Sequence, residues 1–202
     1  ARALSTGSTL TVASGKETVL NLSAAASGQD ALYATVTGTD TPVAAIVRTV
    51  SMDGLTSKGS DYALPNNASA KSLALYGLNG GDHATLYLYT SRKTDVTVSW
   101  IDSKGAQQTN QQELKANRAS AIDLGDVPKS ATGIAIAASE PVSATAKISD
   151  DGPDGQSDFA LVNASAPAKI SAIAVPDQST ATVGFVNTAD GDRTAIVTAY
   201  DT

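Results

Sequence analysis

The sequence repeats itself, and this repeat constrains the fold more than any other feature. Residues 60–69 read SDYALPNNAS and residues 157–165 read SDFALVNAS, an offset of 97 positions between Asp61 and Asp158 (158 minus 61). The register continues on both sides, with insertions only where turns are expected, and its apolar pairs are Val12 and Leu114, Leu22 and Leu124, Val43 and Val142, Leu88 and Phe185, and Val98 and Val197. A period of about one hundred residues suits a domain and is too long for a solenoid repeat. The sequence therefore predicts an internal duplication.

Each repeat reads as a series of short β-strands. Apolar and polar residues alternate in segments such as 32–36, 85–89 and 96–100, and turn signals such as Asn79-Gly80-Gly81-Asp82 separate them. Period-two alternation, β-branched residues and frequent turns are typical of an all-β sandwich. We therefore expect an all-β fold of two tandem immunoglobulin-like antiparallel β-sandwiches. Trp100 falls on the third strand of the unit that begins at Ser72, and immunoglobulin-like folds often bury a tryptophan on this strand.

The duplicated chain can be divided in two ways. A division into residues 1–103 and 104–202 makes each half a complete, permuted sandwich. In the alternative, residues 70–166 are one whole unit, and residues 1–68 and 169–202 close on each other as a second unit. We favour the first division because its contacts stay local in sequence.

The composition excludes several classes of function. The formal net charge is −6, which argues against a nucleic-acid partner because phosphate binding needs clustered Lys and Arg. The chain has no cysteine and one histidine, which excludes thiolate chemistry, disulfides and multi-histidine metal sites within one chain. No stretch has the length of a membrane span or the pattern of a signal peptide, so we expect a mature or truncated soluble piece.

His83 and an acidic loop are the candidates for chemistry. His83 follows Asp82 in a glycine-rich turn, but no nucleophile elbow accompanies it, so we expect a histidine at a hairpin tip rather than a hydrolase site. Asp150, Asp151 and Asp154 form the densest carboxylate cluster, and calcium takes six or more oxygen ligands from such loops. Asp, Gly and Pro also simply make turns, so both interpretations stay open. We expect no other cofactor.

Tyr76, Tyr87 and Tyr89 concentrate in one part of the chain. Strand alternation places Tyr87 and Tyr89 on the face opposite Leu86 and Leu88. Two exposed rings on one sheet could stack against a sugar. We favour the other interpretation, that the rings pack against a neighbouring domain, since aromatic residues mark interfaces of any kind.

The repeated phrase contains an Asp followed by an aromatic residue in both copies. We interpret Asp61 and Asp158 as caps that accept backbone N–H bonds and orient the next strand. Tyr62 and Phe159 would then insert as aromatic anchors. A paired acid and base is the alternative, and it fails because neither copy has a second carboxylate fixed by the pattern.

The sequence also resembles a known family. The segments that carry the resemblance are ATLYLY at 84–89 with DVTVSW at 95–100, LKANRASAIDL at 114–124, residues 133–142, and Asp158-Phe159-Ala160. They are similar to the motifs of an actinobacterial, extracytoplasmic, immunoglobulin-like repeat family, the domain of unknown function 5719. Leu161 stands where the family pattern expects Trp, and Asn117 where it expects a turn Gly. The family supplies no catalytic residues to carry over, and it implies a location at the envelope, often with a membrane anchor.

The function that we expect is therefore non-enzymatic. The chain would be an extracytoplasmic structural or protein-interaction module of the bacterial cell envelope, with an envelope or membrane protein as partner. The resemblance suggests a membrane-associated envelope glycosyltransferase as the protein that it scaffolds. The alternative is a carbohydrate-binding module that uses its exposed tyrosines. The oligomeric state stays open.

Overall fold

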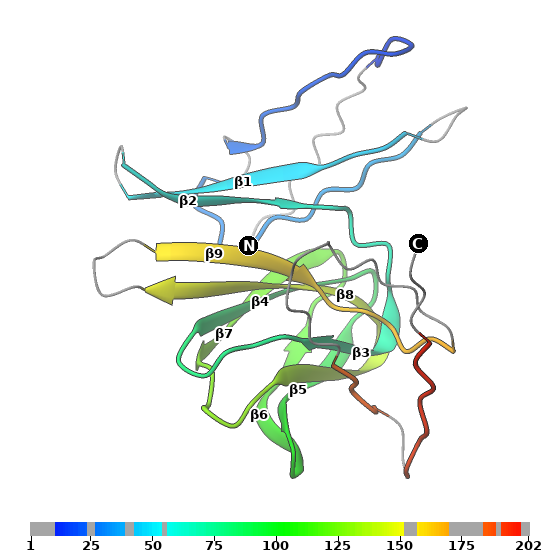
Figure 1. Ribbon diagram of the computed structural model, residues 1–202. Helices are drawn as coiled ribbons and strands as arrows, with labels where there is room; N and C mark the ends of the chain where they lie inside the picture. Colours follow the sequence, from blue (N-terminus) through cyan, green and yellow to red (C-terminus); the bar gives the residue numbers. More distant parts are fainter. Residues whose placement is uncertain are drawn as a thin grey trace.

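The computed structural model describes residues 11–23, 27–38, 43–53, 56–151, 157–169, 184–188 and 191–198 (Figure 1). Their regular elements are nine β-strands: β1 (Val47–Asp53), β2 (Thr56–Ala63), β3 (Ala70–Tyr76), β4 (His83–Thr90), β5 (Thr94–Asp102), β6 (Gly105–Leu114), β7 (Arg118–Asp126), β8 (Gly133–Asp151) and β9 (Ser157–Asn163). Every pair of neighbouring strands is antiparallel. The prediction of an all-β fold with antiparallel sheets is confirmed.

Strands β3 to β9 form one seven-stranded sheet that curls around a core. Its main order is β6-β5-β8-β4-β7, and β3 and β9 also pair with β8. Strand β8 makes this arrangement possible because it is 19 residues long and changes partners along its length. Its first part, residues 133–138, pairs with β3 and β5, and residues 143–151 pair with β4 and β9.

The change of partners occurs at Glu140-Pro141. Proline has no N–H to donate to a ladder, so it suits a point where pairing on one side ends. Two buried threonines satisfy the backbone there. Thr90 Oγ1 donates to the Pro141 carbonyl at 3.2 Å, and Glu140 N donates to Thr94 Oγ1 at 2.8 Å.

Alternation along the strands builds the core. In β4 the residues from His83 to Thr90 are alternately half-buried and buried, and β5 follows the same pattern. Trp100 is 8% exposed and belongs to this core. The other large buried members are Leu73, Leu75, Leu78, Leu86, Leu88, Val96, Val98, Leu114, Ile122, Val127, Ile134, Ile136, Val142 and Ile148.

This core lies within residues 68–166 and continues across the predicted boundary at 103/104. That boundary falls in the turn of the β5–β6 hairpin, where Asp102 is paired with Gly105 and its carboxylate accepts a hydrogen bond from Lys104 N at 2.7 Å. A boundary there would separate two paired strands and divide one core. The strand pairing and the core thus continue through residues 70–166, and the division of the chain into domains stays a prediction. We call these residues the central unit, and the described residues before and after it the N-terminal flank and the C-terminal flank.

The N-terminal flank contains the second sheet of the structure, the β1–β2 hairpin. Its register runs from Val47 opposite Ala63 to Asp53 opposite Thr56, with an irregularity at Ser51-Met52. Figure 1 shows this hairpin (cyan) above β9, on the outside of the central unit. No helix among the described residues has the length and apolarity to cross a membrane.

Candidate interaction surface

The outer face of β4 carries Tyr87 and Tyr89. Both rings are half-buried and point away from the core, because they alternate with the buried residues Leu86 and Leu88. Their neighbours across the β4–β7 ladder are Ala121 and Ala119. Because these alanine side chains are small, the two tyrosine rings project beyond them on the outer face of the sheet, where they can be contacted from outside.

A residue of the N-terminal flank covers one of these rings. Tyr33 stacks on Tyr89 with the ring centroids 3.5 Å apart and the planes within 1° of parallel. The Tyr89 hydroxyl also donates to Asn117 Oδ1 at 3.5 Å. Burial raises the pKa of Tyr33 and of Tyr87, because a buried phenolate loses more hydration than a buried phenol does. The neighbouring Tyr89 phenol raises the pKa of Tyr33 further.

A residue of the C-terminal flank contacts the third tyrosine. The backbone of Gly184 lies against the ring of Tyr76, so closely that a Cβ added to this glycine would overlap the ring atoms. Tyr76 lies at the end of β3, opposite Gly133. The structure therefore gives Tyr76 surroundings different from those of Tyr87 and Tyr89, which share one face of β4. Tyr76 contacts one flank and Tyr89 contacts the other.

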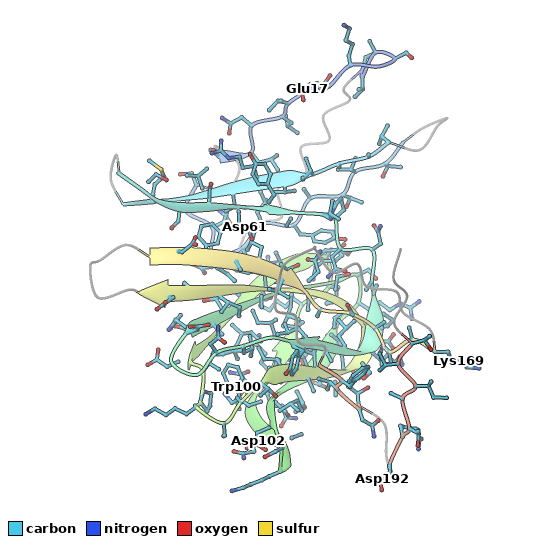
Figure 2. All side chains as sticks on the ribbon, in the orientation of Figure 1. Glu17, Asp61, Trp100, Asp102, Lys169 and Asp192 are labelled. Atoms are coloured by element: carbon cyan, nitrogen blue, oxygen red, sulfur yellow. The ribbon has the colours of Figure 1, made fainter. Side chains whose placement is uncertain are left out.

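The two copies of the repeated phrase lie near each other, and Asp61 joins them. Asp61 Oδ1 accepts a hydrogen bond from Tyr62 N at 2.7 Å, and Asp158 Oδ1 accepts the equivalent bond from Phe159 N at 2.8 Å. The second oxygen of Asp61 accepts a hydrogen bond from Leu161 N on β9 at 2.6 Å. Figure 2 shows Asp61 between the hairpin and β9. This carboxylate therefore satisfies an N–H on the free edge of β9, which would otherwise need water.

The aromatic residues of the two copies have different surroundings. Phe159 is 7% exposed, and the Lys147 ammonium lies 4.8 Å from its ring centroid. Tyr62 is 58% exposed, with the Arg48 guanidinium 5.9 Å from its ring. Alternation puts each ring on the face opposite its Asp, and because Asp61 points toward β9, Tyr62 lies on the face that β9 does not cover.

Asparagine side chains fasten the chain after β2 to the central unit. Asn163 Nδ2 donates to the Leu64 carbonyl at 2.9 Å, and Asn66 Nδ2 donates to the Ala144 carbonyl at 2.6 Å. The Ala68 carbonyl accepts from Ser143 Oγ at 2.9 Å. Sequence reasoning missed these contacts, although the recurrence of Asn in both copies of the phrase was a signal for them.

His83 lies between two carboxylates of β7. Its Nε2 is 2.9 Å from Asp123 Oδ1, and its Nδ1 is 3.3 Å from Asp126 Oδ1. Ser149 Oγ donates to the backbone carbonyl of His83 at 3.5 Å and not to the ring. The carboxylates were not foreseen because they follow His83 by some forty residues. The arrangement places the imidazole between two carboxylates at the rim of the sheet.

The acidic loop is described only in part. Asp150 lies at the end of β8, directly opposite Asp158 on β9, and Asp151 is opposite Ser157. Asp154 lies outside the described residues. Within the residues that the structure describes, no group of three or more Asp, Glu or His side chains is arranged to hold a metal ion. Calcium binding at this loop stays a prediction.

Comparison with known proteins identifies the family. A family model described as "Family of unknown function (DUF5719)" matches residues 1–202. The chain belongs to this family. The resemblance seen in the sequence is thus confirmed at the level of the family, and the actinobacterial origin stays a prediction.

Other comparisons add little. No curated protein matches the sequence. A solved structure titled "Crystal Structure of Thermotoga maritima 1070" is similar over 49% of this chain and 95% of its own, with 14% identity and a TM-score of 0.38. This similarity is too low to define the fold.

In this DUF5719 chain, the outer surface of the central unit is a packing surface. Tyr33 on Tyr89, Gly184 on Tyr76 and Asp61 on β9 are three contacts of different kinds, and each joins a flank to the unit. Stacked rings and a carboxylate on a strand edge are contacts by which β-domains associate.

Proposed function

We propose that the protein is a non-enzymatic structural or interaction module of the bacterial cell envelope. In this proposal it lies outside the cytoplasm and is held at the membrane in the complete protein. Its task is to scaffold a protein partner, for which a membrane-associated envelope glycosyltransferase is the best candidate. The location and the partner follow from the family resemblance.

One observation carries the proposal. The aromatic positions on the outside of the central unit contact other parts of the chain, as Tyr89 does with Tyr33 and Tyr76 with Gly184. Aromatic rings that pack against other protein segments in this way are typical of protein interfaces. The candidate polar clusters, around His83 and Asp61, make contacts that hold strands and the hairpin in place.

The proposal includes the finer architecture. We infer that the central unit is an immunoglobulin-like sandwich, with β3, β5, β6 and the first part of β8 on one side and β4, β7, β9 and the second part of β8 on the other. The change of partners along β8 and the buried Trp100 support this assignment. In the same proposal the flanks are parts of further repeats of this unit.

Affinity capture tests the function. The full chain serves as bait for solubilised envelope membranes and, separately, for the cytosolic fraction of the same cells. We expect an envelope glycosyltransferase to be enriched from the membranes. A Leu88→Asp variant is the matched control, because a charge at this buried position unfolds the core and leaves the rest of the sequence unchanged. Enrichment of unrelated cytosolic proteins alone, or equal capture by the variant, contradicts the proposal.

The alternative is a carbohydrate-binding module that uses Tyr87 and Tyr89. The parallel stack on Tyr89 favours it, because the face of this ring already accepts a flat partner. A sugar would have to displace Tyr33. Glycan-array binding should then vanish in a Tyr87→Ala/Tyr89→Ala double variant and increase in Tyr33→Ala. An array that stays silent for the unmodified chain and for Tyr33→Ala excludes this function.

A further inference from the structure

One side chain of the N-terminal flank lies flat on a side chain of the central unit. The rings of Tyr33 and Tyr89 are parallel within 1°, and their centroids are 3.5 Å apart. This is the one stacked pair of rings recorded among the residues that the structure describes. Two phenols that face each other at contact distance can react with each other as well as pack.

The central unit holds Tyr89 in the orientation that such a reaction needs. Its neighbours on the two adjoining strands are Ala119 on β7 and Ser143 on β8, which are both small. The Tyr89 hydroxyl donates to Asn117 Oδ1 at 3.5 Å, and Asn117 lies in the turn between β6 and β7 with a left-handed backbone (φ 56°). One face of the Tyr89 ring is therefore presented outward, and the ring of the flank occupies it.

The reaction open to two stacked phenols is oxidative coupling. A phenol that loses one electron and one proton becomes a phenoxyl radical, and the unpaired electron is shared with the two Cε atoms beside the hydroxyl-bearing carbon. It occupies π orbitals perpendicular to the ring, so in a parallel stack these orbitals point at the opposite ring. A separation of 3.5 Å is that of reacting atoms in a near-attack geometry. A C–C bond between a Cε of Tyr33 and a Cε of Tyr89 can form from this arrangement.

The contacts that hold the N-terminal flank to the central unit are otherwise non-covalent. The 202 residues contain no cysteine, so no disulfide can join these two parts of the chain. Covalent cross-links form and persist in the oxidising conditions outside the cytoplasm. A bond between Tyr33 and Tyr89 would close a long loop and restrict the unfolded chain, as a disulfide does in other proteins.

We propose that Tyr33 and Tyr89 are a site of oxidative cross-linking that joins the N-terminal flank covalently to the central unit. The oxidant is hydrogen peroxide, used by a haem peroxidase. Each phenol gives up one electron and one proton, and the peroxide takes up both electrons and both protons and becomes two waters. After the C–C bond has formed, each coupled Cε loses its hydrogen as a proton and each oxygen regains one, so that both phenols are restored. The inference is independent of any protein partner and takes only the supply of oxidant from the proposed location.

Treatment of the dilute full chain with a haem peroxidase and hydrogen peroxide tests the site. We expect dityrosine fluorescence, a monomer whose mass is lower by two hydrogen atoms, and a link between the tryptic peptides 17–48 and 72–92, which contain Tyr33 and Tyr89. The yield of this link should not change with protein concentration, because the reaction is intramolecular. Tyr33→Phe and Tyr89→Phe should each abolish it, since phenylalanine keeps the ring and has no phenolic hydrogen to lose.

Two other tyrosines provide matched controls. Tyr87 lies on the same face of β4 as Tyr89, and Tyr62 is 58% exposed, more than Tyr33 at 40%. Tyr87→Phe and Tyr62→Phe should therefore leave the yield of the intramolecular link unchanged. If oxidation followed exposure alone, links through Tyr62 would predominate. That result, or a link that survives Tyr33→Phe, overturns the proposal.

The protein isolated from the cells that make it provides the second test. The same linked peptides should be found in it before any treatment with peroxidase. Their absence from this material overturns the proposal, even where the peroxidase forms the link in the purified chain. Limited proteolysis should also release the N-terminal flank from the untreated chain produced without oxidant and not from the cross-linked chain.

Discussion

Replacement of Asp61 by alanine should release the β1–β2 hairpin from β9. The carboxylate accepts hydrogen bonds from Tyr62 N and from Leu161 N, the latter at 2.6 Å. A hydrogen bond to a charged group contributes about 1.5–3 kcal/mol, and the lower end applies here because Asp61 is half-exposed. The local opening free energy at Leu161 should therefore fall by about 1.5 kcal/mol, or roughly tenfold in the exchange protection of its amide.

Amide hydrogen exchange at Leu161, followed by NMR, measures this effect. Asp158→Ala is the matched control, because Asp158 has the same place in the repeated phrase and accepts from Phe159 N. Asp61→Asn should give an intermediate loss, since one neutral oxygen remains. Unchanged protection of Leu161 in Asp61→Ala, or an equal loss in Asp158→Ala, would show that Asp61 does not hold the hairpin to β9.

Three further perturbations test the packing. Leu88→Ala should lower the free energy of unfolding by about 2–5 kcal/mol in a denaturant titration, because Leu88 is fully buried. Gly184→Ala should release the C-terminal flank, seen as a change in the NMR shifts of the Tyr76 ring, because the added Cβ overlaps that ring. The raised pKa values of Tyr33 and Tyr87 predict a stabilisation that is complete below their ordinary value of 10.0 and is lost as the pH rises through the raised pKa.

Each of these has an outcome that would contradict it. Equal stability of Leu88→Ala and the unmodified chain would place Leu88 outside the core. An unshifted Tyr76 ring in Gly184→Ala would mean that the C-terminal flank does not contact it. The alkaline loss of stability should become smaller in Tyr33→Phe, and an identical pH profile would show that Tyr33 is not buried by its stack.

The strands of the central unit could be predicted because their signal is local. Period-two alternation in β4 and β5 correctly indicated which residues face the core, and Trp100 is buried as expected. Strand β8 continues past Pro141 as one strand because Thr90 and Thr94 bind the backbone at the point where the ladder changes partners.

The contacts of the candidate site could not be predicted because they join residues far apart in sequence. Nothing local to Tyr33 indicates that it stacks on Tyr89, and nothing local to Asp61 indicates an N–H on β9. The prediction of a buried aromatic anchor was wrong for Tyr62, which was expected to be buried because it is equivalent to Phe159 in the repeat. Burial of that position depends on which strand lies above it, and only Phe159 is covered.

Native-state hydrogen exchange of the full chain tests the central claim most directly, namely that residues 70–166 fold as one unit. We predict that the core amides of β3 to β9 open together with one common, highest free energy, and that amides of the β1–β2 hairpin open at a lower one. Two separate opening free energies on the two sides of residues 103/104 would contradict this account and support two permuted domains.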